Sequence, residues 1–130
     1  MRIPIRVSLD HPEPMYHQIK TQLRALIMSG QLEQGMLLPS IRELANDLSC
    51  SVITIRRVYQ DLEMEGLLKT RQGTGTFVAH IEQTEKEKHK LEAVIHAMEE
   101  AINIARQHQY DDEEIQSLFI KCLMNREKED

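Results

Sequence analysis

A polar and basic segment between residues 51 and 60 carries the side chains best suited to contact a nucleic acid. Arginine can donate paired hydrogen bonds to guanine or to phosphate, and threonine and glutamine can bond base edges. If the segment is helical, Ile53, Arg57 and Gln60 point to one side, and Thr54 and Arg56 flank them. A helix with such a face fits the major groove of DNA, so this segment predicts sequence-specific base contacts.

Two short helices joined by a tight turn are expected to hold this face in place. In the first helix, the Ser40 hydroxyl can cap the amide of Glu43 while the Glu43 carboxylate reaches back, which is a capping box. Turn-favouring residues at 49–51 then interrupt the pattern, Ser51 can cap the second helix, and Gly66 can end it. The expected buried face of the second helix consists of Ile55, Val58, Tyr59 and Leu62. This arrangement is a helix-turn-helix.

The segment before the helix-turn-helix predicts a short arm and a further helix. Residues 3–9 alternate weakly and a proline-bearing stretch follows, so we expect an extended arm there. Residues 14–30 place apolar side chains at helical spacing up to a glycine stop, and the outer side of this helix lacks a basic cluster. A structural role is therefore favoured, with Lys20 and Arg24 in solvent. The two leucines at 37–38 are expected to return to the core.

A hairpin with a glycine tip is predicted at residues 67–78. Two short runs rich in Thr, Leu, Phe and Val are joined by Gln72-Gly73-Thr74-Gly75. Glycine at the tip lets backbone amides approach a phosphate, and Lys69 and Arg71 bring charge to the same edge. An ordinary surface hairpin is the alternative, but a hairpin directly after a helix-turn-helix specifies a winged helix. The candidate DNA-binding residues are Arg42, Ser51, Ile53, Thr54, Arg56, Arg57, Gln60, Lys69, Arg71, Gln72, Gly73 and Gly75.

These motifs resemble the head of the GntR family of transcriptional regulators, over about residues 10–79. The matching stretches are Leu38-Pro39-Ser40, Arg42-Glu43-Leu44-Ala45, Ser51, Thr54-Ile55-Arg56, Gly66-Leu67, Arg71-Gln72-Gly73 and Gly75-Thr76-Phe77-Val78. The DNA contacts that the resemblance implies are Arg42, Ser51, Thr54, Arg56 and Gly73. One position departs from the pattern, because Val52 stands where many relatives have arginine. That base contact is not carried over.

The tail predicts two helices and a dimer. A first helix is expected at 84–109, and a second after Tyr110, capped by Asp111 and Glu114. Because a two-helix hairpin has one internal contact face, a second copy related by a twofold axis is expected to cover the remaining apolar surface. The expected interface residues are Leu91, Val94, Ile95, Met98, Ile102, Ile115 and Phe119. The tail resembles that of the YtrA subfamily, in which a compact helical appendage mainly dimerises and some members are encoded beside membrane transporters.

The net charge of -5 does not exclude a DNA-binding protein, because the charge is unevenly distributed. Residues 1–79 hold nine Lys or Arg against eight Asp or Glu, whereas residues 80–130 hold seven against thirteen. The acidic excess therefore lies in the tail, and DNA binding needs only a local basic surface. The modest charge of the head predicts modest nonspecific affinity.

Other chemistries find little support. The set His89, Glu92 and His96 lies near one face of a solvated helix, which does not favour a metal site. Cys50 and Cys122 are expected to be reduced thiols; a redox switch at Cys50 is the alternative to a small turn residue. Scattered Ser, His and acidic residues and the lack of a Gly-Lys-Ser/Thr phosphate loop predict a non-enzyme without cofactors.

The sequence therefore predicts a mainly α fold with a small β wing (α+β): a winged helix-turn-helix at 1–79 followed by a two-helix dimerisation appendage at 80–130. The expected function is that of a homodimeric, cytoplasmic repressor that binds a palindromic operator of its own operon, which could include a transporter. The alternative is a winged helix that binds protein instead of DNA. A small-molecule effector is left open, and no apolar run predicts a membrane span.

Overall fold

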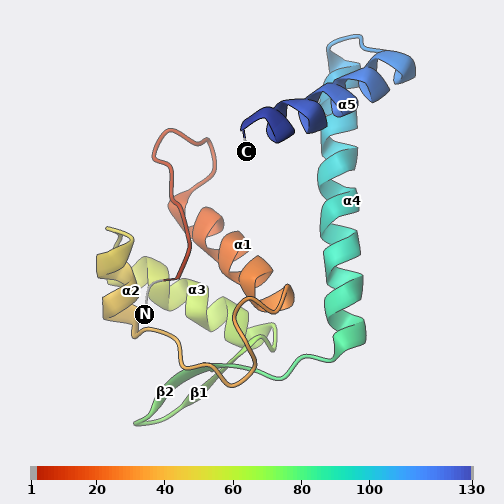
Figure 1. The fold of residues 1–130 in the computed structure, drawn as a ribbon. Coiled ribbons are helices and arrows are strands. Elements are labelled where there is room, and N and C mark those ends of the chain that lie inside the picture. The colour runs from red at the N-terminus through yellow and green to blue at the C-terminus, as the bar shows by residue number, and fades with distance from the viewer. Residues whose placement is uncertain (1–2, 130) are drawn as a thin grey trace. The chain divides into compact units, whose positions relative to one another are not determined.

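The computed structural model describes residues 3–129, with side chains for residues 3–125, and Figure 1 traces its path. The elements are α1 (Met15–Met28), α2 (Ile41–Asp47), α3 (Val52–Met64), β1 (Leu68–Arg71), β2 (Gly75–Val78), α4 (Gln83–Gln107) and α5 (Asp112–Glu129). The chain forms two compact units, Met1–Lys90 and Leu91–Asp130. The mainly α fold with a two-stranded wing is confirmed. The predicted domain boundary at residue 79 stays a prediction. The two compact units meet within α4, which begins in the first unit and continues into the second.

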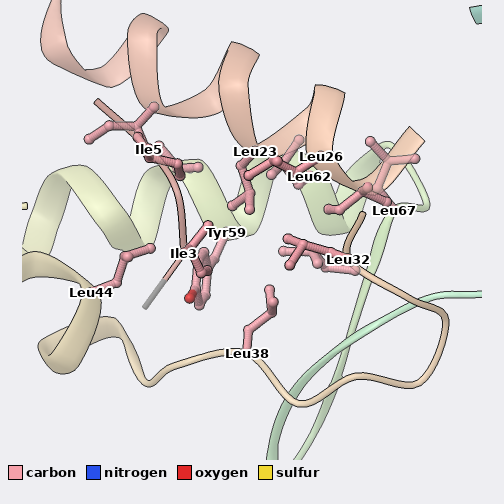
Figure 2. Close-up of a cluster of buried hydrophobic side chains, with 14 of the residues drawn as sticks. Ile3, Ile5, Leu23, Leu26, Leu32, Leu38, Leu44, Tyr59, Leu62 and Leu67 are labelled. Carbon is pink, nitrogen blue, oxygen red and sulfur yellow. The ribbon is translucent and has the colours of Figure 1, made fainter. Parts of the chain in front are cut away.

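The core of the first unit lies among α1, α2 and α3 (Figure 2). Burying one apolar stripe from each helix stabilises all three, since none is long enough to stand alone in water. The predicted buried face of α3 is confirmed, and α1 and α2 bury the residues that complete it. The largest fully buried side chains are Ile19, Leu23, Ile27, Leu44, Ile55, Val58 and Leu62.

The N-terminal arm is anchored to α1 more firmly than its sequence indicates. Ile3 and Ile5 are buried in the core (Figure 2). The buried amide of Gln18 accepts a hydrogen bond from the Ser8 amide at 2.9 Å and donates one back to the Ser8 carbonyl at 2.9 Å. Paired side-chain to backbone bonds of this kind satisfy the polar groups of an irregular segment. The arm therefore completes the core of the winged helix.

Two expectations about α1 are corrected. Lys20 and Arg24 are not free in solvent: Lys20 Nζ lies 3.4 Å from the Asp61 carboxylate, and Arg24 makes paired hydrogen bonds of 2.9 and 2.8 Å to Glu65. Asp61 lies in the last turn of α3 and Glu65 is the residue that caps its C-terminus, so these ion pairs fasten α1 to the C-terminal end of α3. The paired Arg24 bond also holds the pKa of the Glu65 carboxyl below its ordinary value.

The wing is a hairpin with a third short segment beside it. Strands β1 and β2 are antiparallel, with Leu68 opposite Val78 and Arg71 opposite Gly75. Leu37 forms an isolated bridge with Phe77 on the other edge of β2. Leu37 is 50% exposed, which corrects the expectation that it enters the core, whereas Leu38 is buried. The loop before α2 therefore uses Leu37 to pair with the wing.

The second unit contains the rest of α4 and α5. The predicted cap of α5 is present: the Glu114 amide donates to the Asp111 carboxylate at 2.8 Å, and the Asp111 amide donates to the Glu114 carboxylate at 3.0 Å. In the described chain α4 has no buried residue, and Ile115 of α5 is 6% exposed. Among the described residues, no helix has the length and apolar character needed to cross a bilayer.

Candidate nucleic-acid interface

The start of α2 is fixed by two contacts. Ser40 Oγ accepts a hydrogen bond from the Glu43 amide at 3.1 Å, and the Glu43 carboxylate accepts one from the Ser40 amide at 3.5 Å, so the predicted capping box is confirmed. The buried Tyr59 hydroxyl of α3 donates to the Pro39 carbonyl at 2.7 Å. Arg42, exposed in the first turn of α2, is thereby held at a defined position relative to α3.

The turn between α2 and α3 is tight. Ser49 adopts a positive φ of 54°, and the Cys50 amide donates to the Ala45 carbonyl at 2.9 Å, which closes the end of α2. Burial raises the pKa of the Cys50 thiol. A raised pKa favours the protonated thiol over the reactive thiolate, which supports the interpretation of Cys50 as a small, half-buried turn residue.

The first turn of α3 is capped by Ser51, as predicted. Ser51 Oγ accepts from the Thr54 amide at 3.1 Å, and the two hydroxyl groups lie 2.8 Å apart. Ile53, between them in sequence, is 74% exposed. The serine and threonine therefore stabilise the helix end, and Ile53 projects outward.

The two arginines on the outer face of α3, Arg56 and Arg57, have different surroundings. Arg56 is exposed and lines a hollow that is described below. The guanidinium of Arg57 lies 4.0 Å from the centroid of the Tyr16 ring of α1, in a cation–π contact. Gln60 is exposed one turn further along. The stack on Tyr16 orients Arg57, a contact that spacing along α3 alone does not reveal.

A hollow of about 460 Å³, which we call the central hollow, lies between α2, α3 and the wing. It brings Arg42, Arg56 and Gly75 together from three elements, three of the predicted DNA-binding residues. Its apolar wall includes Val52, which stands where many relatives have arginine, and Tyr59, which the sequence assigned only to the buried face of α3. The rest of the wall is formed by residues 37–43, which run from the loop before α2 into its first turn, and by Thr74 and Thr76 of the wing.

The wing places its predicted residues at an exposed edge. Lys69, Arg71 and Gln72 are exposed, and the Arg71 guanidinium lies 5.7 Å from the centroid of the Phe77 ring. Gly73 has a φ of +80°, and no other atom lies within 4 Å of the Cβ that a larger residue would add. The tip therefore needs glycine for its backbone conformation, and the space beside this glycine is open.

The family of the chain follows from comparison with known proteins. The model for bacterial regulatory proteins of the gntR family matches residues 15–78, which span α1 to β2. The chain is 30% identical over 102 residues to the HTH-type transcriptional regulator Rv1152 of Mycobacterium tuberculosis, with 78% of this chain and 79% of that protein covered. It belongs to the GntR family. Its relatives are transcriptional regulators, which confirms the prediction of a non-enzyme.

Two further similarities concern the subfamily of this GntR regulator and its overall fold. The chain is 34% identical over 80 residues to the HTH-type transcriptional repressor YtrA of Bacillus subtilis, covering 62% of each, which confirms the YtrA-like assignment. A GntR family transcriptional regulator from Listeria monocytogenes has a TM-score of 0.73 at 28% identity, with 87% of this chain and 98% of that chain covered.

A DNA complex also resembles this chain. AraR(DBD) in complex with operator ORX1 has a TM-score of 0.53 at 32% identity, covering 60% of this chain and all of that one. The chain is therefore a GntR-family DNA-binding transcription regulator.

Proposed function

We propose that this GntR regulator is a cytoplasmic homodimer that represses its own operon by binding a palindromic operator, with a transporter gene as a candidate member of that operon. The observation that carries the proposal is the central hollow, where Arg42, Arg56 and the wing meet. Arginine side chains at the rim of a concave surface suit a duplex, because phosphates and guanine edges both accept paired hydrogen bonds. The names of the relatives include a repressor, which supports the direction of regulation.

The proposal gives the two arginines of the central hollow different roles. Arg56, on the recognition helix α3, reads a base edge, whereas Arg42, at the start of α2, binds phosphate. Replacing Arg56 with alanine should cost about 1 to 3 kcal/mol of operator binding per site and relax the preference at one base pair. Replacing Arg42 should weaken all sequences alike and reduce the slope of log affinity against log salt by about one per site.

The experiment starts from a random duplex library, from which the full chain selects its preferred operator. Fluorescence anisotropy at several salt concentrations then gives the affinities of both variants for the selected and for scrambled duplexes. Lys121→Ala is the matched control, because it removes an exposed positive charge from α5 in the other unit. If both arginine variants bind the operator as tightly as the wild type, the central hollow does not form the DNA-binding face.

The dimer is proposed from the apolar face of the second unit. Leu91, Val94 and Met98 of α4 are 63%, 53% and 50% exposed, and a hollow of about 440 Å³ is lined by Val94, Met98, Phe119 and three alanines. An exposed apolar stripe on a helix is stabilised when a second copy covers it. Small side chains in such a groove let a partner helix approach closely. The face that dimerises is therefore proposed to centre on α4.

The other proposed interface residues differ in how exposed their side chains are in the single chain. Ile95 is 44% exposed, whereas Ile102 and Phe119 are half-buried in the single chain. Ile115 is buried already without a partner. Its packing role is thus internal to one chain, and its place in the interface stays a prediction.

Substitution of Met98 by glutamate tests the dimer. The change places an unpaired charge in the proposed seam, which should dissociate the dimer, because burial of a lone carboxylate is costly. Asn103→Glu is the control, since it adds the same charge to α4 on a different helical face. Sedimentation should give a monomer for Met98→Glu and a dimer for Asn103→Glu. A dimer in both cases would place the interface elsewhere.

A further inference from the structure

Ile53 stands out on the DNA-facing side of α3. It is the second residue of that helix and is 74% exposed, while its neighbour Val52 packs against the core. Isoleucine has a lower helix propensity than alanine, leucine or arginine, because its branched side chain loses rotamer freedom. Its position therefore gains little for the fold, and a single exposed apolar residue carries meaning only if its surroundings point to a partner.

The surroundings of Ile53 leave an apolar contact at the helix start. The hydroxyl groups of Ser51 and Thr54 bond each other at 2.8 Å, and Ser51 Oγ also caps the Thr54 amide. Arg57, one turn along, has its guanidinium 4.0 Å from the Tyr16 ring centroid. Ser51, Thr54 and Arg57 thus already have partners within the protein. What the first turn presents outward is a branched hydrocarbon.

The major groove offers one feature that a branched hydrocarbon can recognise, the C5-methyl group of thymine. We propose that Ile53 contacts the methyl group of one thymine in each half-site and is a specificity-determining residue of the recognition helix. This inference rests on the proposed function, because it needs α3 in the major groove. It assigns Ile53 a base, whereas Arg56 and Gln60 remain to supply hydrogen bonds from the same face.

The test uses deoxyuridine, which pairs like thymine and differs by that methyl group alone. The full chain first selects its operator from a random duplex library, and each thymine of the selected operator is then replaced singly by dU. Removing one buried methyl group should weaken binding about fourfold, and roughly 15-fold when both half-sites change. Anisotropy titrations measure each affinity for the unmodified protein.

Ile53→Ala completes a double-mutant cycle. It should lower affinity for the thymine operator by at least the dU effect, and then bind the dT and dU operators equally. Alanine has a higher helix propensity than isoleucine, so the variant should keep its fold. An unfolding temperature that does not fall would confirm this. Met64→Ala is the matched control, because it truncates an 88% exposed apolar residue at the far end of α3 and should keep the full dU response.

Two results overturn the proposal in distinguishable ways. If Ile53→Ala keeps the full dU penalty at every thymine, DNA binding stands and the assignment of Ile53 is wrong. If no sequence is enriched from the library, sequence-specific binding itself is wrong, and the inference about Ile53 is overturned with it.

Discussion

Replacement of Tyr59 with phenylalanine removes one buried hydrogen bond that joins α3 to the segment just before α2. The Tyr59 side chain is 5% exposed, and its hydroxyl donates to the Pro39 carbonyl at 2.7 Å. The ring stays, so no cavity forms, but the carbonyl loses its donor inside the protein. Leaving a buried acceptor unsatisfied costs about 1 to 3 kcal/mol, so we expect a loss of that size in the free energy of unfolding.

Thermal and urea unfolding followed by circular dichroism measure the effect. For a unit of about 90 residues, each kcal/mol should lower the melting temperature by about 4 to 8 °C. The matched control is Tyr16→Phe: the Tyr16 hydroxyl accepts from Lys20 Nζ at 3.0 Å on a half-buried surface where water can replace it. That variant should lose less than about 0.5 kcal/mol. Equal losses in the two variants would refute the reasoning about Tyr59.

The buried Tyr59 hydroxyl also predicts how the free energy of unfolding depends on pH. Burial, with a smaller contribution from the Glu43 charge, raises the pKa of Tyr59 above its ordinary value. A raised pKa in the folded state means that the stabilisation is complete below the unfolded pKa of about 10 and declines as the pH rises further. The stability difference between the wild type and Tyr59→Phe should therefore be constant from pH 6 to about pH 9.

Two other predictions concern the wing and the anchor of α1. Gly73→Ala should destabilise the first unit by about 1 to 2 kcal/mol in urea unfolding through its positive φ alone, and Gly73→Asn should lose less, because asparagine tolerates that conformation. Equal losses would contradict a conformational cause. Glu65→Gln should cost less than about 1 kcal/mol at pH 7, since the ion pair with Arg24 is partly exposed. Because the pKa of Glu65 is lowered, this difference should be present above about pH 4.5 and disappear as the pH falls further, and a constant difference would exclude a role for the carboxylate charge.

The parts of the fold that the sequence predicts well depend on neighbouring residues. The Ser40 and Glu43 capping box, the Ser51 cap and the hairpin of the wing each need only a few consecutive residues to form. The buried face of α3 follows from helical spacing, which fixes direction whatever packs against it. Local chemistry was sufficient in these cases because each cap finds its partner within about one helical turn and the strands of the hairpin are joined directly by their turn.

Contacts between distant parts of the chain could not be predicted in this way. Lys20 and Arg24 find their acidic partners 41 residues away, so inspection of α1 alone placed them in solvent. Leu37 has the composition of a core residue, but the strand pairing of its backbone with Phe77 turns its side chain half outward. Only the packed structure determines which neighbour such side chains meet.

The candidate site was predictable in composition but not in arrangement. The sequence identified Arg42, Arg56 and Gly75 as separate candidates, and the fold gathers them around one hollow. It placed Arg57 on the outer face of the recognition helix with Arg56 beside it, and nothing in the local spacing indicated a contact between Arg57 and α1. The Tyr16 ring separates them, because it holds Arg57 against α1.

This distribution of cations bears on how the regulator would discriminate between sequences. Lys20 and Arg24 are paired with the carboxylates of Asp61 and Glu65, and Arg57 and Arg71 lie over aromatic rings. Charge that is neutralised by a carboxylate adds less to the diffuse attraction that any DNA would feel, which depends on releasing counterions from phosphates. Orienting a guanidinium in advance instead lowers the entropy cost of one defined contact. A head of nearly balanced charge that fixes its arginines in this way favours selective binding over nonspecific binding, and a second copy would then supply the affinity that charge does not.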